Sequence, residues 1–216
     1  MKSQNKNIPD NLLELELLNK GYSCIVGIDE VGRGCWAGPV YLGAVVYRLD
    51  SEIIPDVNDS KLLSAKKREF IYTKIAKNTQ YHVEVGSVEM INQIGIGKSI
   101  TKLVENVIEK FNNLSPYYLI DGQFSRDFGP NTRQIIKGDM KHYSIAAASI
   151  MAKVERDNLM VILDQKYPGW QFAKHKGYGT TSHIEALDKL GVSVVHRLNY
   201  KPIMAYLDVS KQKTNR

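Results

Sequence analysis

The feature that most constrains this chain is a short apolar run, 24–28, which leads directly into Asp29 and Glu30 and then into a Gly-Arg-Gly turn at 32–34. The run has the length of a buried strand. Successive side chains on a strand face opposite sides, so both acids can serve one site only if the strand ends there. Glycines permit the necessary turn because they tolerate positive φ. Because a cation follows the acids, we expect a site for metal and phosphate; an ordinary polar turn is the alternative.

Acids also follow two later predicted strands. Asp121 follows 117–120, and Asp139 comes shortly after 133–136. Ligands of open α/β sheets bind at strand ends, so these acids are candidates for one site. Clustered carboxylates repel one another unless protons or cations neutralise them, and Mg²⁺ prefers oxygen ligands. Two such ions can activate a water and stabilise the leaving oxygen of a phosphoryl displacement. Taken singly, Asp121 and Asp139 are better explained as turn residues, but together with the opening motif they favour a shared site.

Hydrophobic periodicity and turn residues predict an α/β sheet with helices on both faces. The predicted strands are 24–28, 40–47, 81–88, 117–120 and 133–136. The predicted helices are a short one after Asp10 that stops at Gly21, one after an N-cap at Ser64, and 88–94, 98–111, 144–165 and 182–190.

Composition narrows the class of protein less than the motifs do. The 216 residues suit one domain, and 29 Lys plus Arg against 23 Asp plus Glu give a net charge of +6, which weakly favours a polyanion partner. Cys24 and Cys35 lack metal-site spacing, so free thiols are expected. No run approaches the ~18 apolar residues of a membrane span, and the polar N-terminus lacks a signal-peptide core. We therefore expect a cytoplasmic protein without membrane contact.

A series of motifs in a fixed order resembles bacterial ribonuclease HII, a type 2 ribonuclease H. The matching segments are DEVGRG at 29–34, AGPV at 37–40, DSKL at 59–62, DG at 121–122, KGD at 137–139, AAASIMAKVERD at 146–157 and HKGYGT at 175–180. The resemblance implies a ribonuclease H-like mixed sheet flanked by helices, with a C-terminal helical extension. It also implies an endonuclease that hydrolyses the RNA strand of RNA–DNA hybrids. Such an enzyme cleaves 5′ of single ribonucleotides in duplex DNA, leaves a 3′-hydroxyl and a 5′-phosphate, and uses two Mn²⁺ or Mg²⁺ ions.

The resemblance assigns roles to individual residues. The implied catalytic and metal-binding acids are Asp29, Glu30, Asp121 and Asp139. The implied substrate-binding residues are Gly32, Arg33, Gly34, Lys61, Ser149, Lys153, Lys176 and Tyr178. The glycine turn would contact the 2′-hydroxyl, which marks a ribonucleotide in a duplex, and Tyr178 would pack on the next sugar. The loop cations suit phosphate contacts. Ser149 and Lys153 share a helix face, which could equally be a solvated surface.

Some segments depart from the family pattern. Cys35-Trp36 stands where a proline and a small or aliphatic residue are more usual, which could alter the rim of the site. The segment 196–200 ends in Asn199-Tyr200 where the family more often has serine-phenylalanine, so we assign no catalytic role to these two residues. His196 is expected to pack or hydrogen-bond rather than to act as a general base.

The resemblance also suggests a domain layout and partners. We expect a partly helical N-terminal extension at 1–23, a catalytic domain at 24–203 and a basic tail at 204–216. The expected partners are RNA–DNA hybrids and ribonucleotide-containing duplex DNA, bound by a monomer. Two alternatives stay open: a ribonuclease HIII-like enzyme that prefers longer hybrids, disfavoured by the short N-terminal segment, and a noncatalytic hybrid-binding module, disfavoured by four intact acids.

Overall fold

The computed structural model describes residues 8–214, with side chains described as far as Leu207. Most of the polar N-terminal segment and the tail cations Lys211, Lys213 and Arg216 therefore lie outside the described side chains. The chain forms two compact units. The first contains the residues up to Val31, Tyr41–Glu84 and Thr101–Val154, and the second contains Gly32–Val40, Val85–Ile100 and the residues from Glu155 onward. In the described part of the chain, no helix combines the length and the apolar character that a membrane crossing needs.

The strands and helices follow the predicted order. The strands are β1 (Ile25–Val31), β2 (Val40–Tyr47), β3 (Tyr81–Gly86), β4 (Tyr117–Asp121) and β5 (Thr132–Ile135). The helices are α1 (Leu12–Asn19), α2 (Ala65–Asn78), α3 (Val88–Ile94), α4 (Ile96–Phe111), α5 (Tyr143–Lys166), α6 (Phe172–His175), α7 (Thr181–Leu190) and α8 (Lys201–Thr214), with short 3₁₀ turns η1 (Asn112–Leu114) and η2 (Gly138–Met140). The predicted N-cap at Ser64 is confirmed, because its side chain accepts a hydrogen bond from the Lys67 amide.

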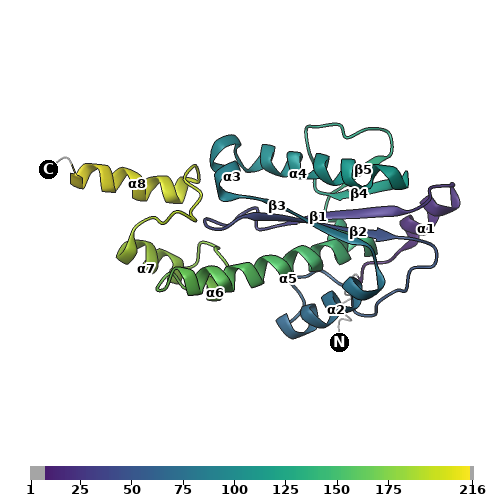
Figure 1. Cartoon of the computed structure of the whole chain (residues 1–216), viewed down its shortest axis with the longest axis horizontal. Helices are drawn as coiled ribbons and strands as arrows, with labels where there is room; N and C mark the ends of the chain where they lie inside the picture. Colours follow the sequence, from purple (N-terminus) through teal and green to yellow (C-terminus); the bar gives the residue numbers. More distant parts are fainter. Residues whose placement is uncertain (1–7, 215–216) are drawn as a thin grey trace, which may run out of the picture. The chain divides into compact units, whose positions relative to one another are not determined.

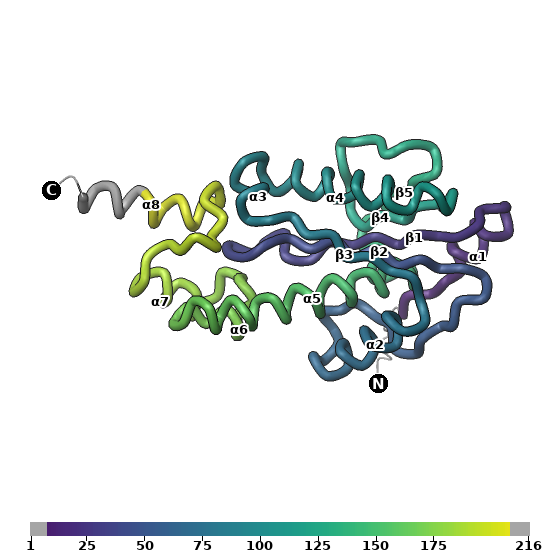
Figure 2. The backbone as a smooth tube through the Cα atoms, viewed as in Figure 1, coloured from purple at the N-terminus to yellow at the C-terminus, as the bar shows by residue number. Residues whose placement is uncertain are grey.

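The sheet is mixed, with strand order β3-β2-β1-β4-β5. Strand β1 pairs antiparallel with β2 and parallel with β4, and β4 pairs parallel with β5. Residues 25–28 and 117–120, far apart in sequence, therefore run side by side (Figure 2). In the first unit, α4 lies along one face of the sheet and α5 along the other (Figure 1). The predicted mixed sheet with helices on both faces is confirmed.

Two glycines allow α5 to lie unusually close to the sheet. A Cβ added at Gly27 would lie 2.2 Å from the Ser144 carbonyl carbon, and one at Gly43 would lie 2.1 Å from the Ala148 carbonyl oxygen. The helix meets them with small residues, because 146–148 are all alanine and fully buried. The same helix carries Ser149, whose side chain hydrogen-bonds Asp29 of β1.

Helix α1 also fixes the start of α5. The buried Glu14 carboxylate accepts hydrogen bonds from the Ser144 amide, at 2.9 Å, and from the Ser144 hydroxyl, at 2.8 Å. An acid at a helix N-terminus satisfies unpaired amides and complements the helix dipole. Burial raises the pKa of Glu14. The sequence pattern showed only the leucines of this helix and missed its one buried acid.

The predicted end of the first strand was wrong. Strand β1 continues past the apolar run to Val31, because β2 pairs with it as far as Val31↔Tyr41. On the other side, the ladder to β4 stops at Ile28↔Ile120. Asp29 and Glu30 thus lie beyond the end of the β1–β4 ladder but within the β1–β2 ladder. The antiparallel partner, which periodicity within residues 24–28 could not reveal, carries the strand onward.

Candidate active site

Asp29 and Asp121 occupy equivalent places on neighbouring parallel strands. The β1–β4 ladder ends at Ile28↔Ile120, and each acid is the next residue on its strand. Parallel strands in register present equivalent residues to the same face of the sheet. The two carboxyl groups are hydrogen-bonded to each other, which tends to lower the pKa of Asp121. The sheet register therefore brings these two predicted site residues together.

Asp139 reaches the same edge through η2. The turn begins after Lys137, which adopts the left-handed conformation at φ 57°. The Gly138 amide then donates to the Asp121 carboxylate at 2.6 Å. Gly138 leaves no room for a side chain, since a Cβ there would lie 2.5 Å from Ile145 Cδ1 and 3.3 Å from Asp121 Oδ1. This hydrogen bond thus links the turn that carries Asp139 to Asp121.

The carboxylates perturb one another strongly. Burial raises the pKa of Asp29 well above its usual value, and the charges of Glu30, Asp121 and Asp139 raise it further. Burial also raises the pKa of Asp121, with the charge of Asp139 adding to the effect. Regular strand alternation would point the Glu30 side chain away from Asp29, yet the Glu30 charge still raises the pKa of Asp29. Such like-charge crowding concentrates negative potential at one sheet edge.

Lys61 and Ser149 partly compensate this charge. The Lys61 ammonium lies 3.3 Å from Asp139 and 3.8 Å from Asp59, while its side chain stays 73% exposed. Burial opposes the charged form of Lys61, but the two acids prevail and raise its pKa. Ser149 is buried, lies 3.0 Å from the Ser60 hydroxyl and also hydrogen-bonds Asp29. The described contacts of Ser149 are therefore with Asp29 and Ser60. Lys153, one turn further along α5, is half-buried.

The donor set of this cluster suits hard divalent cations. Its donors are carboxylate oxygens, the ligands that Mg²⁺ and Mn²⁺ favour, and their mutual repulsion would be relieved by a cation. Within residues 8–214, no group of three acid, histidine or cysteine side chains is already arranged to bind one metal ion. Asp121 and Asp139 instead hold the Gly138 amide and the Lys61 ammonium. An ion would compete with these protein partners for the same oxygens.

In the second unit, the 32–34 turn is held by buried cations. Gly32 has φ +95°, and a Cβ there would lie 2.2 Å from Arg156 Nε, so only glycine fits. The fully buried Arg156 donates to the carbonyls of Pro39 at 2.9 Å, Lys176 at 2.9 Å and Ala37 at 3.3 Å. One guanidinium thus ties the segment after the turn to the loop that carries Tyr178.

Gly34 differs from Gly32. Its φ lies outside the left-handed range and a Cβ would meet nothing within 4 Å. Arg33 and Gly34 are both exposed. The fold therefore requires glycine at 32 but not at 34, which leaves the space beside Gly34 open to a ligand.

Tyr178 lies on a loop whose backbone is closely packed. Tyr178 is 39% exposed, and its ring lies 5.9 Å from the Arg156 guanidinium carbon. Partial burial raises the pKa of Tyr178 to about 12. Gly177 has φ +83°, and Gly179 lies under the Trp36 ring, 2.1 Å from where a Cβ would be. Trp36, one of the two residues at 35–36 that differ from the family pattern, thus supports this loop. Lys176 is left-handed at φ 53° and offers its carbonyl to Arg156.

A relay of neutral histidines also holds this loop. The Ser193 amide donates to His196 Nδ1 at 3.0 Å, so Nε2 carries the proton of neutral His196. It then donates to His183 Nε2 at 3.0 Å, which leaves His183 Nδ1 to donate to the Tyr178 carbonyl at 3.0 Å. Burial lowers the pKa values of His183 and His196 to about 4. His196 is a packing and hydrogen-bonding residue, as predicted.

Sequence reasoning missed the two buried arginines and Tyr200. Arg156 lies within the 146–157 motif, but nothing local distinguishes it from a surface cation on a long helix. Arg197 is fully buried and donates to the carbonyls of Gly38 at 2.9 Å and Arg33 at 3.0 Å. The one available signal was the clustering of turn residues in 32–39 and 175–180, because irregular backbone leaves carbonyls that need donors.

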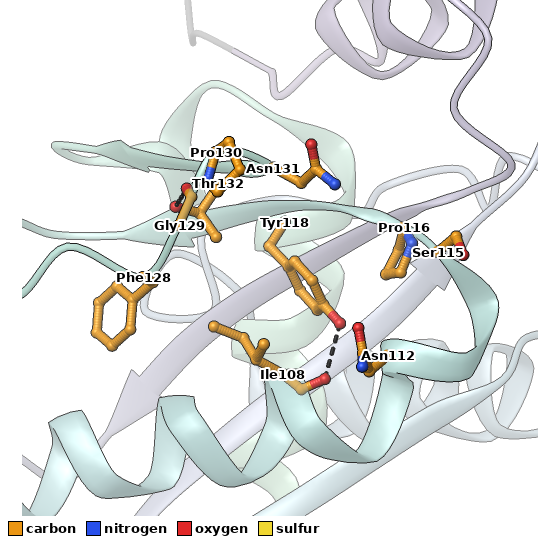
Figure 3. A pocket seen from close by; sticks show the side chains of 10 residues that line it. All are labelled: Ile108, Asn112, Ser115, Pro116, Tyr118, Phe128, Gly129, Pro130, Asn131 and Thr132. Carbon is orange, nitrogen blue, oxygen red and sulfur yellow. Dashed lines mark hydrogen bonds between the residues drawn. The ribbon is translucent and has the colours of Figure 1, made fainter.

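A separate hollow in the first unit lacks the features of a catalytic site. It has a volume of about 240 Å³ and lies where the end of α4 meets the 128–132 loop (Figure 3). Its lining is neutral, without acid, lysine, arginine or histidine. The Tyr118 hydroxyl donates to the Ile108 carbonyl at 2.9 Å across it. The acids of β1 and β4 are the better candidate.

Solved structures share the fold of this chain. A ribonuclease HII from Archaeoglobus fulgidus, solved in a complex with PCNA, is 26% identical with a TM-score of 0.67, covering 82% of this chain and 95% of that one. Bst-RNase HIII in complex with Mn²⁺ is 19% identical with a TM-score of 0.68, covering 89% and 71% of the two chains. These likenesses confirm the predicted ribonuclease H-like fold.

Sequence comparison identifies the family. The ribonuclease HII of Caldicellulosiruptor bescii is 45% identical over 195 residues, which cover 88% of this chain and 94% of that protein. The ribonuclease HII of Listeria monocytogenes strain EGD-e is 43% identical over 195 residues, 88% and 72% of the two chains. The family model described as Ribonuclease HII matches residues 26–203, which span both the acid cluster and the loops around Tyr178. The chain therefore belongs to the ribonuclease HII family and is an enzyme of the ribonuclease H class.

Proposed function

We propose that this enzyme hydrolyses the RNA strand of RNA–DNA hybrids and cleaves duplex DNA on the 5′ side of a single embedded ribonucleotide. The observation that carries the proposal is the placement of Asp29 and Asp121 in register on adjacent strands, with Asp139 tied to them through Gly138. Membership of the ribonuclease HII family supports a nuclease rather than a noncatalytic module.

The proposed reaction breaks one phosphorus–oxygen bond. Water adds to phosphorus, and the 3′-oxygen of the preceding nucleotide leaves and takes up a proton, so the products are a 3′-hydroxyl and a 5′-phosphate. Two bound Mg²⁺ or Mn²⁺ ions would lower the pKa of the attacking water and stabilise the leaving oxygen. Asp29, Glu30, Asp121 and Asp139 would hold the ions.

Lys61 would also act on the phosphate. Its side chain is exposed, and its ammonium lies 3.3 Å from Asp139. If Asp139 held a cation, the ammonium would be available to a phosphate oxygen, because Lys binds phosphate as a point charge. Lys176, Arg33 and Lys153 are further candidates for phosphate contacts along the duplex.

The ribonucleotide would be recognised through backbone and ring contacts. The exposed peptide of Gly34 has open space beside it and can approach a 2′-hydroxyl, the group that separates RNA from DNA. The Tyr178 ring, partly exposed, can pack on the next sugar. A deoxyribose suits that contact, because a 2′-hydroxyl there would be desolvated without a partner.

The decisive experiment uses a DNA duplex containing one ribonucleotide. Cleavage should depend on divalent cation, with Mg²⁺ and Mn²⁺ compared. It should occur at one position, leaving a 3′-hydroxyl on the nucleotide before the ribonucleotide and a 5′-phosphate on the ribonucleotide. An all-DNA duplex is the substrate control, a continuous RNA–DNA hybrid is the second substrate, and chelation of the metal separates binding from cleavage. Binding without metal-dependent cleavage would favour the noncatalytic module. Cleavage of continuous hybrids alone would favour the ribonuclease HIII-like preference.

A further inference from the structure

Two side chains from the same short segment hold the carbonyl of Arg33, the middle residue of the 32–34 turn. The Tyr200 hydroxyl donates to this carbonyl at 2.6 Å, and Arg197 Nη1 donates to it at 3.0 Å. Arg197 Nη1 also donates to the Tyr200 oxygen at 3.0 Å, and its guanidinium carbon lies 5.3 Å from the centre of the Tyr200 ring. The three groups form a closed hydrogen-bonded triangle.

Peptide geometry carries the effect of this triangle to the next residue. A peptide group is planar and trans, so the Arg33 C=O and the Gly34 N–H point in opposite directions. The described part of the chain contains no cis peptide bond. A donor pair that fixes the carbonyl therefore also fixes the direction of the Gly34 amide. No described residue accepts a hydrogen bond from that amide, and the space beside Gly34 is open.

The triangle depends on the Tyr200 hydroxyl. Arg197 is fully buried, and its remaining donors are Nε, bound to the Gly38 carbonyl at 2.9 Å, and Nη2, which has no acceptor among the described residues. With one nitrogen already without an acceptor, the guanidinium relies on its three bonds to Gly38, Arg33 and Tyr200. Loss of the hydroxyl removes one of these acceptors and one of the two donors to Arg33.

We propose that Tyr200 is a positioning residue for substrate recognition: its hydroxyl, together with Arg197, directs the Gly34 amide outward to meet the 2′-hydroxyl of a ribonucleotide. This inference rests on the proposed function, because it assumes that the 32–34 turn contacts the substrate. It assigns a role to a residue that the sequence pattern left without one.

The test compares Tyr200→Phe with Tyr206→Phe. The first removes one oxygen and keeps the ring over Arg197. The second removes a hydroxyl whose one partner among the described residues is the Asp188 side chain, at 2.8 Å, in the same unit of the fold. For each protein, fluorescence anisotropy without divalent cation measures the affinity for a duplex with one ribonucleotide and for the matched all-DNA duplex. Thermal melting confirms that both variants fold.

The expected result is a loss of discrimination. Tyr200→Phe should lower the ratio of the two affinities about tenfold, the scale of one well-placed hydrogen bond, and lower kcat/KM on the ribonucleotide substrate similarly. Affinity for the all-DNA duplex should stay within about twofold, and Tyr206→Phe should match wild type in every measurement. Equal losses on both duplexes, or no loss, would overturn the role assigned to Tyr200.

A measurement on the wild-type protein provides an independent check. The amide resonance of Gly34 should move downfield with the ribonucleotide duplex and much less with the all-DNA duplex; equal shifts would also overturn the inference. Failure of the proposed function looks different. In that case wild type itself would not distinguish the two duplexes and would not cleave at the ribonucleotide.

Discussion

The acid cluster of the first unit and the loops of the second unit use buried charge in opposite ways. Asp29, Asp121 and Asp139 are like charges crowded at one sheet edge, where burial and repulsion raise the pKa of Asp29. Arg156 and Arg197 are buried cations that have no acid partner among the described residues, and each donates to backbone carbonyls. The first arrangement leaves mutual repulsion that a bound cation could relieve, whereas the cations of the second bind groups within the protein.

The two regions affect the stability of the folded state in opposite directions. Crowded carboxylates weaken the folded state in the absence of cations, as functional sites commonly do. Buried guanidinium groups instead satisfy carbonyls that would otherwise lack donors and so fix loop backbone. We therefore expect cleavage to depend on the charges of the acid cluster. We expect substrate recognition to depend on the direction of the peptide groups in the loops.

Removing charge from the acid cluster should have the largest effect. Asp121→Asn or Asp139→Asn should reduce cleavage of a single-ribonucleotide duplex by at least about a thousandfold, the scale of losing a principal electrostatic contribution to catalysis. Steady-state kinetics with Mg²⁺ measures this, and Glu109→Gln, on the exposed side of α4, is the matched control. Wild-type rates in both variants would remove these acids from the site.

The second prediction replaces the cation that ties the loops together. Arg156→Met keeps much of the side-chain length but leaves the carbonyls of Ala37, Pro39 and Lys176 without this donor. Each unsatisfied buried carbonyl costs ~1 kcal/mol or more, so we expect about 3 kcal/mol of destabilisation. Urea unfolding measures the loss, with Arg126→Met, exposed and paired with Glu105, as the control. A loss as small as the control's would mean that the loops hold their shape without Arg156.

The two regions should also respond oppositely to acid. His183 and His196 have pKa values lowered to about 4, so the unfolded chain, with histidine pKa near ~6.5, binds protons first. Their contribution is complete above pH ~6.5 and is lost toward pH ~4, amounting to about 2–3 kcal/mol for the coupled pair. Asp29 has a raised pKa, so its cost to the folded state disappears as pH falls through that value.

Hydrogen exchange can separate these two effects. Amides of α7 should lose protection between pH 6.5 and 4 after correction for intrinsic exchange rates, whereas those of β4 should lose less. His183→Gln should flatten the acid dependence in α7, and His82→Gln, on β3, should not. The same pH dependence in wild type and His183→Gln would show that the relay does not govern acid stability.

The smallest expected effect is a gain. Asp29→Asn removes a buried charge that its neighbours disfavour, and should stabilise the metal-free protein by about 1 kcal/mol at neutral pH while abolishing cleavage. Thermal melting in chelator measures the gain, and added Mg²⁺ should stabilise the wild type more than the variant. A variant less stable than wild type in chelator would mean that the carboxylate hydrogen bonds outweigh the repulsion.

Much of the fold and the acid pattern follows from local sequence. Strand β2 and helices α3 and α7 lie within a residue or so of their predicted bounds, because apolar periodicity reports which face each element buries. Acids directly after apolar runs showed which residues could meet at a sheet edge. The motif order then identified the family without any contact information. The proposed division at residues 23 and 203 stays a prediction.

Tertiary structure alone decided how β1 ends and what holds the loops. The strand continues through Asp29 and Glu30 because β2 pairs with it, and a partner strand cannot be deduced from the run itself. Arg197 and Tyr200 hold the carbonyl of Arg33 across more than 160 positions of sequence. Local patterns record how polar a residue is but not which distant backbone group it will satisfy, so the acids were predictable and the residues that orient the recognition loops were not.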